Sequence, residues 1–204
     1  VCLFARSKYS NDDFKITGGQ LQLRRFISKK EYLFSKIRQM EVPYGAYTDN
    51  GREIPQQTLA LYITPNPRNI EKATKNAIKK LTQLVLDPYS GYKPYSEVLS
   101  ELQTAYSRKV HMNFDFDDVD YKDVLNTIEQ NNIMNLDAID IVKTRGGFHL
   151  MANVDKIHDK YRKSWYLGMT KIPGWDKKSG STDGLLPIPG CVQGGFSPYM
   201  FPAV

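Results

Sequence analysis

Two aspartates separated by a single residue lie in the run Phe114-Asp115-Phe116-Asp117-Asp118. On a β-strand, residues two apart point to the same face and lie about 6.6 Å apart along the backbone, so Asp115 and Asp117 can share one or two hard cations. Mg²⁺ in proteins is usually held by one or two carboxylates together with substrate phosphates. A pair of such ions clamps the attacking and leaving oxygens of a phosphoryl transfer. The same pattern is compatible with a solvent-facing acidic edge or a structural calcium site.

A second group of polar side chains lies on a glycine-containing segment. This segment is Lys143-Thr144-Arg145-Gly146-Gly147-Phe148-His149. Paired glycines readily adopt positive φ and predict a tight turn, whose backbone N–H groups can bind an anion. The guanidinium of Arg145 matches the geometry of a phosphate. His149 leaves the turn on the face opposite to Phe148, where it can join the carboxylates. An ordinary β-turn with a surface histidine is the alternative.

Asp183 is the candidate for a third carboxylate. It precedes a stiff segment rich in proline and glycine, residues 184–190, and a Gln-Gly-Gly turn at residues 193–195. The alternative is a loop residue that starts a turn. Asp118 is left out of the site, because its side chain would point to the apolar face if the strand continued that far.

Several classes of protein are excluded by the sequence. It has no Gly-x-x-x-x-Gly-Lys-Ser/Thr loop, which excludes a P-loop NTPase. No apolar run approaches the roughly 20 residues of a membrane span, and the first residues are too weakly apolar for a secretory signal. Cys2 and Cys191 are too few for a disulfide framework or a zinc cluster. We therefore expect reduced thiols and a cytoplasmic location, with a single Cys2–Cys191 bridge as the alternative.

The elements that position these residues follow from hydrophobic periodicity. Residues 110–117 alternate in character and predict a strand with the acids on one face. After it we expect a helix at 121–131, strands at 138–143 and 148–154, a helix from 154 to about 169, and a closing strand at 185–192. This β-α-β-β-α-β order predicts an α/β (α+β) fold with a ferredoxin-like or RNA-recognition-like lobe.

The first part of the chain predicts a second, basic lobe. Residues 1–85 carry a net charge of +8, whereas residues 86–204 carry −2. We expect a helix at 28–40, a strand at 58–64, a helix at 70–85 capped by Asn69, and a helix at 96–108 after a linker at 87–95. A basic lobe beside an acidic one fits a protein that holds a polyanion next to bound cations. Solvated, lysine-rich helix surfaces would explain the same asymmetry.

The order of the motifs resembles the archaeo-eukaryotic primase superfamily, the primase-polymerases. Asp115-Phe116-Asp117 is similar to the family's Asp-x-Asp/Glu strand motif, and Gly147-Phe148-His149 is similar to its small-x-His motif. The longer run from Arg145 to His149 is similar to the family's Gly-Arg-Gly-Phe-His form. The segments at residues 186–190 and 193–195 look like the sequence near the third motif. The resemblance covers residues 110–195 and, more loosely, residues 59–81.

This resemblance implies a two-lobed, primase-like fold. Residues 1–90 would form the basic N-terminal αβ lobe, and residues 91–204 would form the RNA-recognition-like catalytic lobe. Asp115 and Asp117 would bind Mg²⁺ or Mn²⁺, with Asp183 as the third acid. The reaction would be the attack of a hydroxyl group on the α-phosphate of a nucleotide, with pyrophosphate leaving.

The resemblance also implies partners for the site. His149 would contact the phosphates of an incoming nucleoside triphosphate, with Arg145, Lys143 and Thr144 beside it. The basic lobe would hold a single-stranded DNA template during DNA replication. Many relatives carry a helicase, so a replicative helicase is a candidate partner, and the small size suggests a phage or a mobile element.

Two other functions fit the same residues. The first is a catalytically inactive replication-initiation or single-stranded-DNA-binding protein, which would use the basic lobe and some of the 13 tyrosines for base stacking. The second is a metal-dependent nuclease that uses the same carboxylates.

Overall fold

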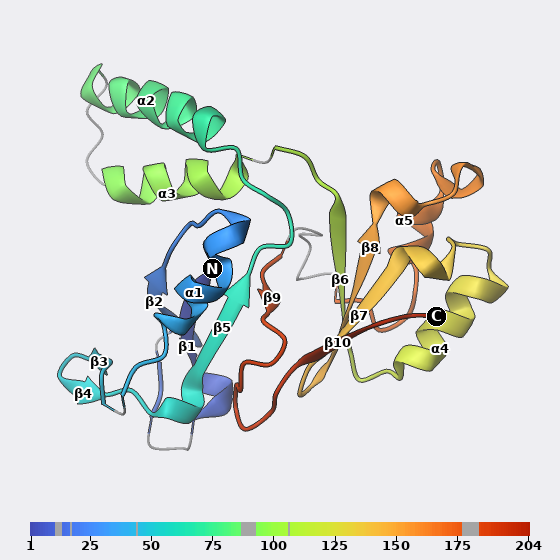
Figure 1. Ribbon diagram of the computed structural model, residues 1–204, viewed down its shortest axis with the longest axis horizontal. Helices are drawn as coiled ribbons and strands as arrows, with labels where there is room; N and C mark the ends of the chain where they lie inside the picture. Colours follow the sequence, from blue (N-terminus) through green and yellow to red (C-terminus); the bar gives the residue numbers. More distant parts are fainter. Residues whose placement is uncertain (11–13, 17, 44, 87–92, 106, 177–183) are drawn as a thin grey trace.

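In the part of the chain that the structure describes, two four-stranded antiparallel sheets and five α-helices form an α+β fold (Figure 1). The computed structural model describes residues 1–10, 14–16, 18–43, 45–86, 93–105, 107–176 and 184–204. A short hairpin, β3 (Thr48–Asp49) with β4 (Arg52–Glu53), forms a third sheet. Among the described helices, none combines the length and apolar character needed to cross a membrane.

The first sheet has the strand order β2 (Gln20–Arg25), β1 (Cys2–Arg6), β5 (Leu59–Ile63) and β9 (Leu186–Pro187). One face of β1 and β5 packs into a core that also holds Ile37 of α1 (Leu33–Arg38). The opposite face carries a smaller cluster made by Cys2, Phe4, Ala60 and Tyr62. Alternation along the strands therefore gives this sheet two apolar faces.

A helical hairpin stands at one end of the first sheet (Figure 1). It consists of α2 (Ile70–Leu86) and α3 (Pro94–Thr104), which pack against each other. The side chain of Asn69 caps α2 by accepting a hydrogen bond of 2.9 Å from the Lys72 N–H, as the sequence predicts. Because α3 packs on α2, the hairpin extends across the boundary that the sequence predicts near residue 90.

The second sheet has the strand order β10 (Tyr199–Pro202), β7 (Ile139–Lys143), β8 (Gly147–Asn153) and β6 (His111–Asp117). One face is covered by α4 (Tyr121–Gln130) and α5 (Trp165–Met169), and the rings of Phe116 and Phe148 stack there with centroids 5.3 Å apart. Phe114, Phe116, Phe148, Ile141 and Leu150 are fully buried in this core. The strands and the helix α4 match the predicted elements within about two residues.

The outer edge of β6 has one further partner. Trp175, which follows α5, forms an antiparallel bridge with Phe116. Across this side of the sheet, the neighbours are in the order Trp175, β6, β8 and β7. The segment that follows α5 therefore lies beside β6, the first strand of the predicted β-α-β-β-α-β unit. In the described residues, the last strand of the predicted β-α-β-β-α-β unit is thus represented by the Trp175 bridge alone. β10 is an additional strand at the opposite edge of the sheet, next to β7.

Two sequence predictions are wrong in this part of the chain. The closing strand expected at residues 185–192 is absent from the second sheet, because its Leu186–Pro187 portion pairs with β5 of the first sheet. Pro187 and Pro189 lack N–H groups, which restricts such a segment to a short edge strand. The helix expected at 154–169 is also absent, except for α5.

Asn135 explains the missing helix. Its side-chain oxygen accepts a hydrogen bond of 2.9 Å from the His158 N–H, and its Nδ2 donates to the Lys156 carbonyl at 3.0 Å. These bonds hold the backbone around Ile157 in an extended conformation. The chain therefore forms two short 3₁₀ turns, Val154–Lys156 and Asp159–Tyr161, before α5 begins.

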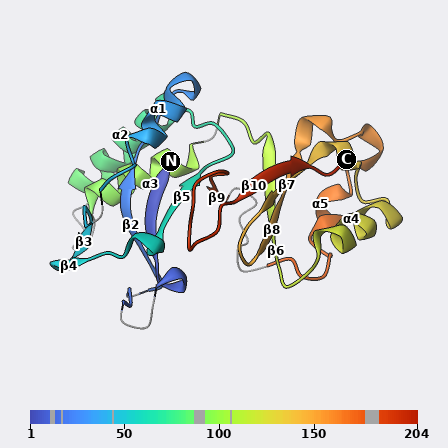
Figure 2. The same ribbon diagram turned by 60° about the horizontal axis from the view of Figure 1, so that its bottom comes forward.

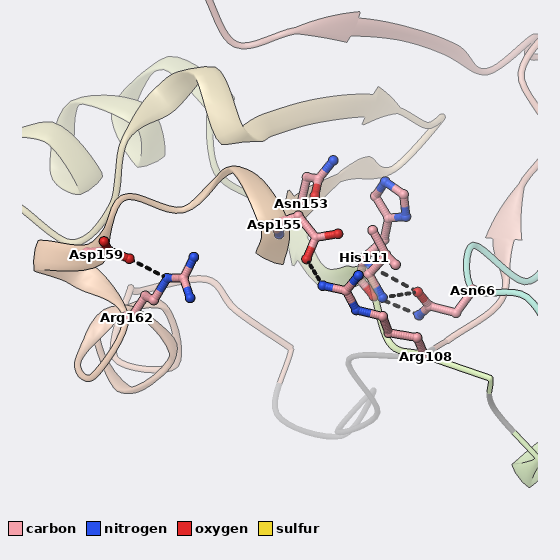
Figure 3. A network of polar contacts seen from close by, with 8 residues as sticks. Asn66, Arg108, His111, Asn153, Asp155, Asp159 and Arg162 are labelled. Atoms are coloured by element: carbon pink, nitrogen blue, oxygen red, sulfur yellow. Dashed lines mark hydrogen bonds and ion pairs between the residues drawn. The ribbon is translucent and has the colours of Figure 1, made fainter.

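Asn66 joins the loop after β5 to the start of β6 (Figure 3). Its Oδ1 accepts hydrogen bonds of 2.8 Å from the N–H groups of Val110 and His111, and its Nδ2 donates to the His111 carbonyl at 2.7 Å. The side chain is 1% exposed. An ion pair between Arg108 and Asp155 lies beside this joint. Asn66 therefore fixes where the acidic strand begins.

We expect Asn66→Ala to lower the free energy of unfolding by about 2–3 kcal/mol, because it leaves the Val110 N–H and both backbone groups of His111 without their partner. Urea denaturation would measure the change. Asn126→Ala, at an exposed position of α4, is the control and is expected to change stability by less than about 0.5 kcal/mol. Equal stability of the two variants would contradict this role for Asn66.

Candidate functional site

The acidic residues lie on the face of the second sheet that α4 and α5 leave uncovered. Val142 and Met151 on this face pack against Leu186 of β9 and Ile63 of β5, so this face is turned toward the first sheet. β9, the edge strand of the first sheet, lies on the side that faces the second sheet in both views (Figures 1 and 2). The candidate site therefore lies at the junction of the two sheets.

Antiparallel pairing of β6 with β8 brings the two sequence motifs together. Asp115 is directly opposite His149, and Asp117 is directly opposite Gly147. The Nδ1 atom of His149 lies 3.3 Å from Oδ1 of Asp115, without the alignment of a hydrogen bond. The side chains are 12% exposed for His149 and 28% for Asp115, while Asp117 at the strand end is exposed. Both carboxylates and the imidazole thus share one face.

Asp176 brings a further carboxylate to this region. Its N–H donates a hydrogen bond of 2.9 Å to the Asp115 carbonyl, next to the Trp175 bridge. Directly opposite residues of an antiparallel pair project to the same face, and the carboxylate of Asp176 contributes to raising the pKa of Asp115. The predicted third acid, Asp183, lies outside the described residues. Asp176 was not predicted from the sequence, because a segment that forms one bridge has no strand-like alternation.

Burial and nearby charges shift the pKa values of Asp115 and His149. Burial, followed by the nearby carboxylates of Asp117 and Asp176, raises the pKa of Asp115 to about 6. Burial, followed by the positive charge of Lys8, lowers the pKa of His149 to about 4. His149 is therefore neutral near pH 7, and its contact with Asp115 is a dipolar contact. The repulsion between carboxylates is what a bound cation would relieve.

Gly147 makes room for Asp117. A Cβ atom at this position would lie 2.1 Å from the Phe116 carbonyl oxygen and 2.7 Å from Oδ1 of Asp117. The Gly147 N–H donates to the hydroxyl of Thr144 at 3.2 Å, which closes the turn between β7 and β8. A small residue is thus required at position 147 for steric reasons. Thr144 stabilises the turn through its hydroxyl group.

The two basic residues of the turn do not join the carboxylates. Lys143 is directly opposite Phe148, and its Nζ lies 5.9 Å from the centroid of that ring, on the face that carries the core. The guanidinium of Arg145 donates a hydrogen bond of 2.9 Å to the Gly194 carbonyl. Arg145 therefore ties the turn to the segment between β9 and β10.

Asp118 leaves the strand altogether. It has a φ of 59°, a left-handed conformation that ends β6, and its side chain is exposed. It therefore does not point into the core, the orientation that the sequence predicted for a strand that continued. Asparagine adopts this conformation readily, so Asp118→Asn is a suitable control for the variants below.

The donor set fits a hard divalent cation only in part. Within the described ranges, no three carboxylates, histidines or cysteines are grouped closely enough to hold a metal. Asp115 and Asp117 present oxygen ligands on one face, which suits Mg²⁺ bound by two carboxylates and by substrate phosphates. Asn113, two residues before Asp115, is 7% exposed, and its Oδ1 has no hydrogen-bond partner in the described part of the chain.

Comparisons of the chain with protein-family models, with curated proteins and with solved structures find no match.

We expect Gly147→Ala to weaken Mn²⁺ binding and to destabilise the protein by about 1–3 kcal/mol, because the added methyl group displaces the Phe116 carbonyl and Asp117. Calorimetric titration and urea denaturation would measure the two effects. Gly146→Ala is the matched control, since a Cβ atom there meets open space at an ordinary φ. Unchanged Mn²⁺ binding by Gly147→Ala would contradict the proximity to Asp117.

We expect Asp115→Asn to stabilise the metal-free protein at pH 7.5 by about 1–2 kcal/mol. The folded pKa of about 6 is above the usual 3.8, so ionisation of Asp115 costs stability. That cost is absent below pH 3.8 and develops as the pH rises through 6. The gain should therefore shrink as the pH falls from 7.5 toward 4.

Urea denaturation at several pH values would measure this difference, with Asp118→Asn as the control. Added Mn²⁺ should stabilise the wild-type protein more than Asp115→Asn. A loss of stability in Asp115→Asn at pH 7.5 without metal would contradict the electrostatic cost.

Proposed function

We propose that the protein is a metal-dependent nucleotidyltransferase of the primase-polymerase type, which joins nucleotides on a single-stranded DNA template during DNA replication. One observation carries the proposal. Asp115 of the Asp-x-Asp pair lies directly opposite His149, and Asp117 lies directly opposite Gly147, although the two motifs are far apart in the sequence. His149, a residue that can bind phosphate, thus lies beside two carboxylates.

Asp115 and Asp117 would hold Mg²⁺ or Mn²⁺, and Asp176 is the described residue that could serve as the third acid in place of Asp183. When bound, such ions neutralise charge on the transferring phosphate and increase its reactivity. Burial and then the neighbouring carboxylates raise the pKa of Asp115, and ligation of a cation by Asp115 would offset both effects. The electrostatic cost of the metal-free site therefore supports a cation-binding role.

The chain's own side chains orient the nucleotide. His149 has one ring nitrogen, Nδ1, next to Asp115. Its other nitrogen, Nε2, carries the proton in the Nε2–H tautomer and is assigned as donor to a phosphate oxygen of the incoming nucleoside triphosphate. The turn closed by Thr144 and anchored by Arg145 holds this histidine at the strand start. A 3′-hydroxyl group attacks the α-phosphate, and pyrophosphate leaves.

The arrangement of the sheets supports a primase-like, two-lobed organisation. The second sheet carries the carboxylates, and the sequence that forms most of the first sheet is rich in lysine and arginine. We assign the template to this basic lobe, because phosphate contacts of Lys and Arg dominate binding to nucleic acids. A cytoplasmic location and a replicative helicase as partner belong to the same proposal.

Primer extension on single-stranded DNA, with Mg²⁺ or Mn²⁺ and nucleoside triphosphates, tests the proposal. We expect the double variant Asp115→Asn/Asp117→Asn to lose at least about 100-fold in the rate of incorporation, because the metal ligands are removed. Asp176→Asn, tested separately, should also reduce the rate. Asp118→Asn should retain the wild-type rate.

The other outcomes are informative as well. Incorporation that survives the double substitution would reject the proposed site. DNA binding that weakens with salt, without any incorporation by the wild-type protein, would favour the non-catalytic binding module. Metal-dependent cleavage of labelled DNA without nucleotides would favour the nuclease.

A further inference from the structure

A row of aromatic rings reaches the surface at one edge of the second sheet. Tyr199 belongs to β10, the edge strand beside β7 (Figure 2), and is 53% exposed. Its ring stacks on Phe201 with centroids 5.7 Å apart, and it lies 6.4 Å from the ring of Phe196 in the preceding turn. Phe201 in turn packs edge-on against Tyr121 of α4 at 5.5 Å. Tyr199 is therefore supported by neighbouring rings while about half of it stays open to solvent.

Two cations adjoin these rings. Lys143 of β7 is directly opposite Tyr199, so the two side chains project to the same face of the sheet with Cβ atoms about 5 Å apart. Arg145, in the turn after β7, donates a hydrogen bond of 2.9 Å to the Gly194 carbonyl. Gly194 lies in the turn that leads to Phe196. Both cations are therefore next to the segment that carries the exposed rings.

Neither cation forms an ion pair with an acid in the described part of the chain. The Nζ of Lys143 lies near the Phe148 ring, and the guanidinium of Arg145 binds a carbonyl group. Because a guanidinium has five N–H donors, Arg145 keeps donors for a phosphate. The sequence predicts both cations as phosphate-binding residues, yet Lys143 lies on the sheet face opposite to Asp115. A phosphate contact separate from the carboxylates gives them a role.

An exposed ring beside unpaired cations suits single-stranded DNA better than a protein partner. Aromatic side chains stack on any base, and neighbouring Lys and Arg residues bind the phosphates on either side of it. A protein strand added to the edge would instead need free N–H and C=O groups along β10. This strand is only four residues long and ends at Pro202, which has no N–H group. The edge therefore offers little to an added strand.

We propose that Tyr199, Phe196, Lys143 and Arg145 form a contact surface for single-stranded DNA. A base stacks on Tyr199, and the adjoining phosphates contact the two cations. The inference goes beyond the proposed nucleotidyl transfer, because binding here requires neither a metal ion nor the carboxylates. Lys143 and Asp117 lie at the same end of the sheet, on strands that are two spacings or about 10 Å apart. A strand held at this surface can therefore continue around that end toward the carboxylates.

Fluorescence anisotropy of a labelled oligothymidine, titrated with the whole chain in EDTA without nucleotides, tests the surface. We expect Tyr199→Ala to weaken binding at least about fivefold, because the stacking of one base is lost. Tyr199→Phe keeps the ring and should bind within about twofold of the wild-type protein. Met200→Ala is the matched control, since Met200 is 54% exposed and points to the opposite face of the same strand.

Two further measurements separate stacking from phosphate contact. Lys143→Gln should weaken binding and reduce the slope of log affinity against log salt concentration by about one, because one phosphate contact is lost. Lys156→Gln, exposed in the 3₁₀ turn at the other end of β8, is the charge-matched control. The binding of a duplex of the same length should not respond to Tyr199→Ala, because its bases are already stacked on one another.

Unchanged affinity in Tyr199→Ala overturns the surface, as does an equal loss in Met200→Ala or an absence of single-strand binding by the wild-type protein. If urea denaturation shows that Tyr199→Ala is unfolded, the salt slope of Lys143→Gln decides. Self-association that Tyr199→Ala abolishes, with unchanged DNA binding, would identify β10 as a protein interface and reject the surface.

Primer extension separates the surface from the proposed polymerase function. If the wild-type protein incorporates no nucleotide but Tyr199→Ala selectively loses single-stranded DNA, the surface stands and the polymerase function falls. If incorporation is observed and DNA binding is unaffected in Tyr199→Ala, the surface alone falls.

Discussion

The antiparallel register between β6 and β8 is the constraint on which the site and the core both depend. On one face it stacks Phe116 on Phe148 beneath the helices. On the other face it sets Asp115 opposite His149. Because side chains alternate along a strand, a slip of one residue would exchange the two faces, burying carboxylates and exposing the aromatic rings. The hydrophobic core of the second sheet therefore specifies the position of the polar site, and the joint at Asn66 fixes where the strand enters it.

The electrostatic interactions within the site are unfavourable in the absence of a ligand. Like-charged carboxylates lie near a neutral imidazole, and burial raises the free energy of the ionised Asp115. Such a cluster persists because the aromatic and aliphatic core behind it holds the strands in place. The positive charges of Lys8 and Arg6 act in the opposite direction and lower the pKa of Asp115, but they do not outweigh burial and the two carboxylates.

The sequence predicts those features that have a local cause. The alternation of apolar and polar residues predicted β6, and the glycine pair predicted the turn before His149. The two strands that hold Asp115 and His149 could therefore be predicted from the sequence. Features set by distant contacts could not be predicted. Asn135 replaces the expected helix after β8 by binding the backbone around Ile157. Asp176 reaches the site through one bridge, and the position of the Lys143 ammonium near the Phe148 ring depends on which face of the sheet the helices cover.

The segment from β9 to β10 completes one sheet and then the other, because Leu186–Pro187 pairs with β5 and Tyr199–Pro202 pairs with β7. Both strands follow, in the chain, every strand that they pair with. Neither sheet can close during synthesis until residues 186–202 have left the ribosome, so the two halves mature together. The same crossing prevents the protein from being divided by one cut into two independently complete pieces. Assembly of the polar site is thereby coupled to the last stage of folding.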